Sequence, residues 1–211
     1  MSIKPPQKIP KKPPKVDRKQ KLLEAAVATF ARLGPKATVD EICADAEINK
    51  RMVYHYFGSK AGLYKAALMH VYNKLQTVEI ELATMMLSPE EMLRQLVGQY
   101  YDFLYETPEF IRMLSFENLD DAKTARELSL KNNKAPIVEA LKLALEKGHA
   151  EGHFRKDIDV KELLVSIFGL CFFYFSNHRT LEQTLGLGPM TRLAVKRRKE
   201  HVIDLILKGI S

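Results

Sequence analysis

TVDEICADAEINKRMVYHYFGSK, from Thr38 to Lys60, contains the signals for two short helices joined by a tight turn. Thr38 and Glu41 form a capping-box pair, because the hydroxyl can accept from the Glu41 N–H group while the carboxylate accepts from the Thr38 N–H group. A helix should therefore begin directly after Thr38. Its apolar residues follow the i, i+3, i+4, i+7 spacing of one buried face: Val39, Ile42, Cys43 and Ala46.

A second helix is predicted over residues 50 to 57. Asn49 has the chemistry of its N-cap, and Gly58 ends it. Three side chains share one side and should anchor this helix to a core: Val53, Tyr56 and Phe57. The others face outward or along the flanks, where their chemistry suits a DNA groove: Lys50, Arg51, Met52, Tyr54 and His55.

The next helix should start at Ser59, which is a further N-cap residue. Its free N–H groups, with the Lys60 ammonium beside them, suit a phosphate. We therefore interpret residues 38 to 60 as a module that reads DNA.

A family resemblance rests on these same residues. Ala46-x-Ile48-Asn49-Lys50, followed by Tyr54-His55-Tyr56-Phe57-Gly58-Ser59-Lys60 and then Leu63, resembles the tetracycline-repressor (TetR) family. The resemblance is strong over residues 17 to 70, and the rest of the chain matches only in its helical layout. The chain departs from the family at two positions. Glu47 stands where the family usually has glycine in a turn that tends to need positive φ, and Arg51 stands where many members have a small residue.

The predicted DNA contacts divide by chemistry. Lys50 and Arg51 are suited to guanine O6 and N7, and an arginine pair of this kind discriminates by about 1 to 3 kcal/mol. Tyr54 and His55 suit phosphates or a thymine methyl group. The resemblance implies that Thr38 and Lys60 bind the DNA backbone. The complete predicted set also includes two further residues, Asn49 and Met52, and for each member the alternative is a solvated surface group.

The net charge of +7 is concentrated at the N-terminus of the 211-residue chain. Residues 1 to 21 hold eight of the 33 lysines and arginines and one acid, Asp17, so the remaining residues balance with 25 bases and 25 acids. Five of the ten prolines lie among the first fourteen residues. Residues 1–16 are therefore predicted to be a disordered basic arm, which either follows DNA phosphates or the minor groove, or is a solvated leader.

Helical periodicity continues along the chain, with no convincing strand and no repeat, so the fold class is all-α. Pro136 should break one of the predicted helices, and a loop of glycines and polar residues should run from Gly148 to Asp157. The predicted helices are 17–33, 61–86, 89–106, 108–118, 120–148, 160–178 and 191–208. We divide the chain into the arm, a three-helix helix-turn-helix domain (17–64) and a C-terminal helical effector-binding and dimerisation domain (65–211).

The last two long helices, 160–178 and 191–208, carry more apolar surface than a small core needs. We expect them to pair with a second copy, although they could also be the core of a monomer. A two-fold dimer would present two reading helices about 34 to 36 Å apart, or a multiple of that spacing, and so would bind a palindromic operator in double-stranded DNA.

A cavity for a small apolar or amphipathic effector is predicted among the middle helices, because the resemblance implies an inducer. Most such side chains are simply core in other proteins. The candidate lining is apolar and aromatic with a few polar groups: Tyr101, Leu104, Phe110, Met113, Phe116, Glu117, Phe168, Phe172 and Asn177. Ligand binding would favour a conformation with misplaced reading helices and so release DNA.

Catalysis, cofactors and metals find little support in the residues. No Gly-x-Ser-x-Gly, P-loop or dinucleotide motif occurs. His149 and His153 have metal-ligand spacing, but Gly148 and Gly152 favour a loop there. Cys43 and Cys171 lie in apolar stretches and are expected to be buried free thiols. No apolar run approaches the about 18 residues of a membrane span, so a cytoplasmic protein is expected.

The resulting hypothesis is a sequence-specific transcriptional regulator, a non-enzyme that represses from a palindromic operator until a ligand releases it. Two alternatives remain. The first is a helical dimeric scaffold protein with only nonspecific nucleic-acid binding, and the second is an activator on the same fold.

Overall fold

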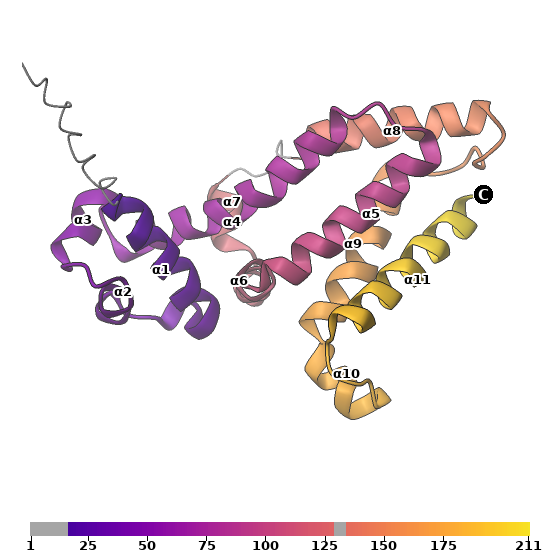
Figure 1. Ribbon diagram of the computed structural model, residues 1–211. Helices are drawn as coiled ribbons and strands as arrows, with labels where there is room; N and C mark the ends of the chain where they lie inside the picture. Colours follow the sequence, from indigo (N-terminus) through magenta and orange to yellow (C-terminus); the bar gives the residue numbers. More distant parts are fainter. Residues whose placement is uncertain (1–16, 129–133) are drawn as a thin grey trace, which may run out of the picture.

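The computed structural model describes residues 17–128 and 134–211, and within these ranges the chain is helical with no strand (Figure 1). The predicted basic arm, residues 1–16, lies outside them. The all-α prediction is confirmed, together with its division into a small N-terminal group of helices and a larger C-terminal group. The exact boundary predicted between residues 64 and 65 stays a prediction, because one continuous helix runs across it.

The N-terminal group contains three α-helices and a short 3-10 turn. Their bounds are α1 Arg18–Leu33, η1 Gly34–Lys36, α2 Val39–Ala46 and α3 Arg51–Phe57. Side chains with no exposed surface form their common core: Leu22, Phe30, Ile42, Val53 and Leu63. Ile42 and Val53 belong to the apolar faces predicted for α2 and α3, so one small core holds α1, α2 and α3 in a fixed arrangement.

A polar link fixes α1 against α2. The carboxylate oxygen Oδ2 of Asp45 accepts from the Thr29 hydroxyl at 2.8 Å and from the Arg32 guanidinium at 3.0 Å. Thr29 is completely buried, so its hydroxyl would cost free energy without this partner. The link therefore makes the orientation of α2 depend on the last two turns of α1.

Two long helices follow the N-terminal group. α4 (Lys60–Ala83) runs away from it, and α5 (Pro89–Glu106) runs back toward it (Figure 1). α4 ends three residues before the predicted Met86. α5 begins as predicted, because the Ser88 hydroxyl accepts from the Glu91 N–H group at 3.3 Å and proline occupies the first helical position.

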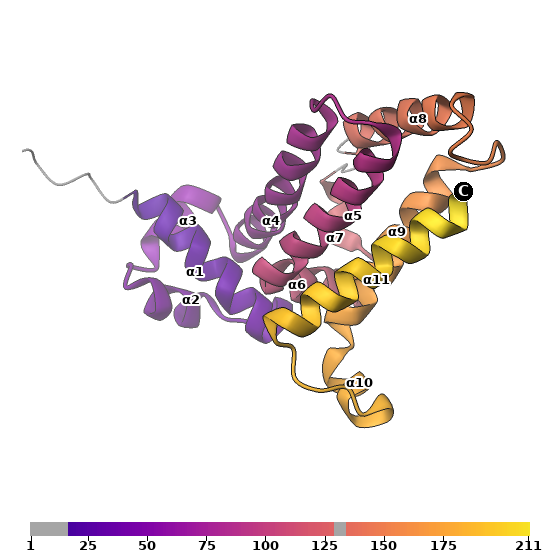
Figure 2. The same cartoon turned by 45° about the vertical axis from the view of Figure 1, so that its right-hand side comes forward.

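α6 (Pro108–Leu119) is the element that connects the two groups. It packs against α1 and η1 on one side and against α4, α5 and α9 (Val160–Ser176) on the other. In Figure 2, α6 lies beside the C-terminal end of α1. A displacement of α6 would therefore act directly on α1 and η1.

The helical segment predicted over residues 120–148 is divided into two helices, as Pro136 indicated, but its first helix begins later than predicted. The chain turns through Asp121 and Ala122, both at positive φ, and the structure has two helices, α7 (Lys123–Glu127) and α8 (Ala135–Ala150). Pro136 lies in the first turn of α8, where a missing N–H group costs nothing.

The predicted loop start at Gly148 is also wrong, since α8 continues to Ala150. The Phe154 ring packs directly against the glycine. A Cβ atom on Gly148 would lie 2.2 Å from Cδ2 of that ring, so the glycine is required by close packing and not by a turn.

The chain ends in three helices, of which the sequence predicted two. α9 ends at Ser176, before the predicted His178, and α10 (His178–Leu185) leaves it at an angle of 77°. The short, mostly polar α10 was missed. α11 (Arg192–Ile210) begins as predicted, with the Thr191 hydroxyl accepting from the Ala194 N–H group at 3.2 Å.

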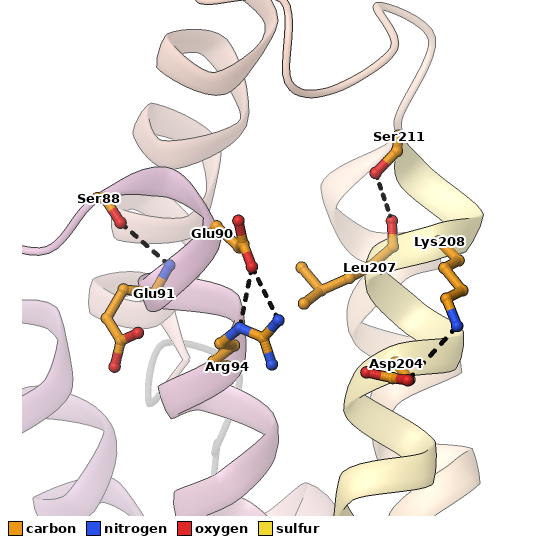
Figure 3. Close-up of polar contacts among 8 residues, drawn as sticks. All are labelled: Ser88, Glu90, Glu91, Arg94, Asp204, Leu207, Lys208 and Ser211. Atoms are coloured by element: carbon orange, nitrogen blue, oxygen red, sulfur yellow. Dashed lines mark hydrogen bonds and ion pairs between the residues drawn. The ribbon is translucent and has the colours of Figure 1, made fainter.

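α11 closes the C-terminal domain by packing along α5 and α9. The Lys199 ammonium binds the Asp102 carboxylate at 2.8 Å and so joins α11 to α5. Figure 3 shows the first turn of α5 beside the last turn of α11, each with its own local pair, Glu90 with Arg94 and Asp204 with Lys208. Because these pairs stay within one helix and are exposed, apolar packing holds the two helices together.

Candidate nucleic-acid interface

The capping box at the start of α2 is formed as the sequence predicted. The Thr38 hydroxyl accepts from the Glu41 N–H group at 3.2 Å, and the Glu41 carboxylate accepts from the Thr38 N–H group at 2.7 Å. These hydrogen bonds to Thr38, that from its backbone first, lower the pKa of Glu41. Thr38 is exposed, but its hydroxyl and its N–H group are both engaged in the cap.

The turn between α2 and α3 has the positive-φ geometry for which the family usually has glycine, although this chain has Glu47 there. Glu47 adopts the left-handed conformation, with φ 54° and ψ 40°. The Ile48 N–H group donates to the Cys43 carbonyl at 3.0 Å and the Glu47 N–H group donates to the Ala44 carbonyl at 3.1 Å, which is the Schellman pattern. A glutamate therefore fills a glycine position, and its carboxylate pairs with Lys21 of α1 at 3.2 Å.

α3 begins one residue later than predicted, at Arg51. Asn49 still caps it, because its side-chain oxygen accepts from the Arg51 N–H group at 2.9 Å. Val53 is completely buried, and Tyr56 and Phe57 are partly buried against the core, as predicted. The opposite face of α3 is thereby turned to solvent.

The solvent face of α3 brings together most of the side chains predicted to contact DNA. Arg51 and His55 are exposed, and Tyr54 keeps 51% of its surface exposed. Asn49 is also exposed, whereas Met52 is half-buried and packs against the core. Arg51, Tyr54 and His55 are therefore the best-placed side chains for a groove.

Lys50 has a partner that the sequence analysis did not anticipate. Its ammonium binds the Asp40 carboxylate of α2 at 2.8 Å, and this hydrogen bond raises the pKa of Lys50. The residues are ten apart, so spacing along one helix gave no signal. Both side chains remain largely exposed, so the pair is weak and a DNA phosphate could replace Asp40.

The α3–α4 junction depends on Gly62. Ser59 caps α4 by accepting from the Gly62 N–H group at 3.0 Å, as predicted, and Lys60 lies half-buried in its first turn. A Cβ atom on Gly62 would lie 2.1 Å from the Phe57 carbonyl oxygen, so only glycine lets α4 approach the end of α3 this closely. The sequence showed this glycine, but not the contact that requires it.

The predicted effector cavity is mostly packed core. Tyr101 and Met113 have no exposed surface and Phe110 has almost none. Glu117 is buried, and its carboxylate accepts from the Ala125 N–H group at 3.0 Å, so it holds α7 to α6. This role lies within the fold and does not orient a ligand.

The remaining members of that predicted set, apart from the buried Leu104, are more open. Phe168, Phe172 and Asn177 are half-buried, and Leu104 and Phe116 line a groove of about 570 Å³. The groove lies between α1, α5, α6, α9 and α10. Its place differs from the predicted one, because it reaches the DNA-binding domain.

The histidines and cysteines considered as metal ligands or reactive thiols all lie within residues 17–128 and 134–211. No group of three or more His, Cys, Asp or Glu side chains there could hold a metal ion. Nδ1 of His149 lies 3.2 Å from the Phe154 carbonyl, and His153 follows in the turn after α8. Cys43 and Cys171 are buried free thiols as expected, and burial raises the pKa of Cys171 to about 12.

Length and composition rule out a membrane crossing by any single helix of the described residues. α9 and α10 pass that test only as a pair, and they are bent by 77°. α2, α3 and α4 each have a capped start, and α3 turns basic and aromatic side chains to solvent, which is the arrangement of a helix-turn-helix DNA-binding protein.

Comparison with known proteins identifies the family. The model of the bacterial regulatory proteins of the tetR family matches residues 22–67, and the tetracyclin repressor-like C-terminal domain matches residues 89–206. The HTH-type transcriptional repressor NicS of Pseudomonas putida is 34% identical over 191 residues, which cover 90% of each chain. The chain belongs to the TetR family of transcriptional regulators, as its resemblance implied.

Two solved structures share the fold. The ketosteroid transcriptional regulator KstR2 of Mycobacterium tuberculosis superimposes with a TM-score of 0.71 at 22% identity, covering 93% of this chain and 96% of that one. FadR of Bacillus subtilis, solved with stearoyl-CoA, gives a TM-score of 0.68 at 17% identity, covering 91% and 99%. This chain therefore shares its fold with both of these structures.

Proposed function

We propose that this regulator represses transcription by binding a palindromic operator as a homodimer, and that a small amphipathic ligand releases it. The observation that carries the proposal is the solvent face of α3, where Arg51, Tyr54 and His55 project from a helix held rigidly by caps and core. As a bacterial regulator of transcription it would act in the cytoplasm, without catalysing a reaction.

Each side chain at the interface has a proposed role. Arg51 reads guanine O6 and N7, while Tyr54 and His55 contact phosphates or a thymine methyl group. Lys50 exchanges Asp40 for DNA, and Lys60 with the first N–H groups of α4 binds a phosphate. Asn49, Met52 and Thr38 are supporting contacts. Asn49 and Thr38 each cap a helix, and Met52 packs on the core.

Dimerisation is proposed through α9 and α11. α9 turns Val165 (65% exposed) and Phe173 (56% exposed) to solvent, with Gly169 between them, and α11 exposes Leu193 and Leu205. Apolar side chains aligned on neighbouring helices support an interface with a second copy. Two α3 helices would then reach successive major grooves, about 34 to 36 Å or a multiple apart.

Ligand release is supported by the relatives. NicS is named as a repressor, and FadR of B. subtilis was solved with stearoyl-CoA. A ligand would act by binding the conformation with misplaced α3 helices more tightly, which typically changes DNA affinity by about 1 to 3 kcal/mol. Activation from the same operator remains a second function of this fold, decided by where the operator lies relative to the promoter.

The first test is selection of bound fragments from a random DNA pool at near-physiological salt. The native chain should enrich a palindrome, and an Arg51→Ala, Tyr54→Ala variant of verified dimeric state should not. Arg126→Ala, which removes an exposed arginine from α7, is the matched control and should enrich the same palindrome. Equal, salt-sensitive binding by all three without sequence preference would contradict the assignment of α3.

A further inference from the structure

The groove that reaches the DNA-binding domain has an apolar floor. Leu104 of α5, Ile111 and Phe116 of α6 and Phe175 of α9 contribute to it, with Met190 from the segment before α11. The C-terminal end of α1 forms one wall with Ala31 and Arg32. Its volume of about 570 Å³ lies within the range of small-molecule sites in proteins.

The charged groups of the groove are cationic. Arg32, Arg112 and Arg179 line it, and its lining contains no Asp or Glu. Of the three hydroxyls in the lining, those of Ser115 and Ser176 already donate to backbone carbonyls at 2.8 and 2.9 Å, and the third belongs to Tyr105. The charged hydrogen-bond donors for a ligand are therefore guanidinium groups, which bind carboxylates in a bidentate manner.

Arg112 and Arg179 are the arginines free to take such a ligand. Both are exposed, and neither forms an ion pair within residues 17–128 and 134–211. Arg32 differs, because its guanidinium binds Asp45 at 3.0 Å. Two neighbouring guanidinium groups, those of Arg112 and Arg179, without a counterion among the described residues favour an anion, and the apolar floor favours a ligand with a hydrocarbon body.

We propose that this groove binds an amphipathic carboxylate, with the anion held by Arg112 and Arg179 and the apolar body over Leu104, Phe116 and Phe175. The inference rests on the proposed ligand-controlled function and names the site and chemical class of its effector. The packed region around Tyr101 and Met113, where the sequence placed the cavity, is not needed for binding.

The groove is coupled to the DNA-binding helices through two contacts. Phe116 lies against Gly34 of η1 so closely that a Cβ atom there would be 2.8 Å from the ring. Arg32 shares the wall of the groove and also holds Asp45 of α2. A carboxylate in the groove competes with Asp45 for Arg32, and a ligand body that moves Phe116 moves η1, so both effects change the position of α2 and α3.

The test compares binding of decanoate, decan-1-ol and decylammonium to the full-length chain by calorimetry. Decanoate should bind, and the Arg112→Gln, Arg179→Gln variant should bind it about tenfold or more weakly, as expected for loss of charge-assisted hydrogen bonds. The alcohol should bind weakly and equally to both proteins, and the ammonium should not bind. Arg126→Gln is the control and should match the native chain.

Binding of a labelled operator fragment, measured with and without decanoate, separates this inference from the proposed function. Decanoate should release the native chain from DNA, while the double variant binds DNA equally well and resists release. Operator binding without any decanoate binding, or equal decanoate affinity in the variant, overturns the groove assignment alone. Decanoate binding that leaves DNA affinity unchanged overturns the coupling. If the native chain shows no sequence-specific DNA binding, the proposed function is overturned. Decanoate binding that depends on the two arginines would still support the groove assignment in that case.

Discussion

The solvent-exposed surfaces of α3 and α9 differ in the chemistry of their side chains. α3 exposes basic and aromatic side chains with polar tips. Asn49 caps this helix, and Thr38 and Ser59 cap its neighbours α2 and α4. α9 exposes Val165 and Phe173. The first surface is stable in water and ready for a polar partner, whereas the second gains free energy only when another apolar surface covers it.

The comparison extends to the interiors of the two regions. In the N-terminal domain the buried Thr29 hydroxyl has its partner in Asp45. In the C-terminal domain Glu79 of α4 is buried, and only one of its carboxylate oxygens has a partner among the described residues, the Lys134 ammonium. A buried polar group with its partner and a buried carboxylate with only one oxygen paired differ in how easily their surroundings rearrange, which suits a fixed DNA-reading domain joined to a responsive one.

The largest expected effect comes from placing charge on the exposed face of α9. Val165→Asp with Phe173→Asp should give a monomer by sedimentation equilibrium, because two carboxylates would be buried in the proposed interface. Operator affinity should fall by about 10²-fold or more, since the second half-site no longer binds intramolecularly. The measurement is a titration of palindromic DNA.

Leu143→Asp on α8 provides the matched control for that variant. Leu143 is 57% exposed, close to the value for Phe173, but it lies on another helix. It should leave the dimer and its DNA affinity intact. A dimeric α9 variant would show that the apolar face of α9 has another purpose and would remove the contrast drawn here.

The second prediction concerns the buried pair of Glu79 and Lys134. Burial raises the pKa of Glu79, and the ammonium of Lys134 opposes that shift. Lys134→Met should lower the free energy of unfolding at neutral pH by about 2 kcal/mol, less than for a fully buried pair because Lys134 is one-third exposed. The measurement is urea denaturation, and Glu79→Gln in the same chain should restore most of the loss.

The variant should also respond to pH in a defined direction. A glutamate whose pKa is higher in the folded than in the unfolded state binds its proton more tightly when folded. Stability is therefore greatest at low pH and is lost as the pH rises through the folded pKa. Lys134→Met should thus be more stable relative to the native chain at pH 5 than at pH 7, and a flat difference between the two would contradict a buried, uncompensated carboxylate.

Sequence signals were sufficient where structure is local. The caps at Thr38, Asn49 and Ser59 and the apolar face of α2 were all predicted from neighbouring residues, and so was the family. The exposed face of α3 followed from the same spacing. What could be predicted was therefore the N-terminal module and the beginnings of most helices.

Contacts between distant residues could not be predicted in this way. The Asp40–Lys50 pair joins two helices, Gly148 is required by a ring six residues away, and the groove depends on helices from both domains. The sequence did not separate cavity residues from core residues for the same reason, because an aromatic residue at helical spacing looks identical whether it lines a site or fills a core. Packing decides between these, and one sequence does not contain it.

The smallest expected effect comes from substituting two glycines, one at the α3–α4 junction and one on α5, which tests the contrast between the N-terminal module and the C-terminal domain. Gly62→Ala places a Cβ atom 2.1 Å from the Phe57 carbonyl oxygen, so α4 must move away from α3, whereas Gly98→Ala on α5 meets nothing within 4 Å. Alanine is favoured over glycine within a helix by about 0.5 to 1 kcal/mol. Gly98→Ala should therefore stabilise the protein by about that amount. Gly62→Ala has the same propensity gain, but the close contact outweighs it, so this variant should be destabilised overall by about 1 kcal/mol.

Thermal unfolding and operator binding of the two glycine variants together decide the outcome. Gly62→Ala should also weaken operator binding, because the first turn of α4 carries Ser59 and Lys60 toward the DNA backbone, while Gly98→Ala should leave it unchanged. If both variants were stabilised equally and both bound DNA normally, the approach of α4 to α3 would be adjustable. The N-terminal module would then share the adaptability that we assign to the C-terminal domain, and a ligand could act on α3 without passing through α6.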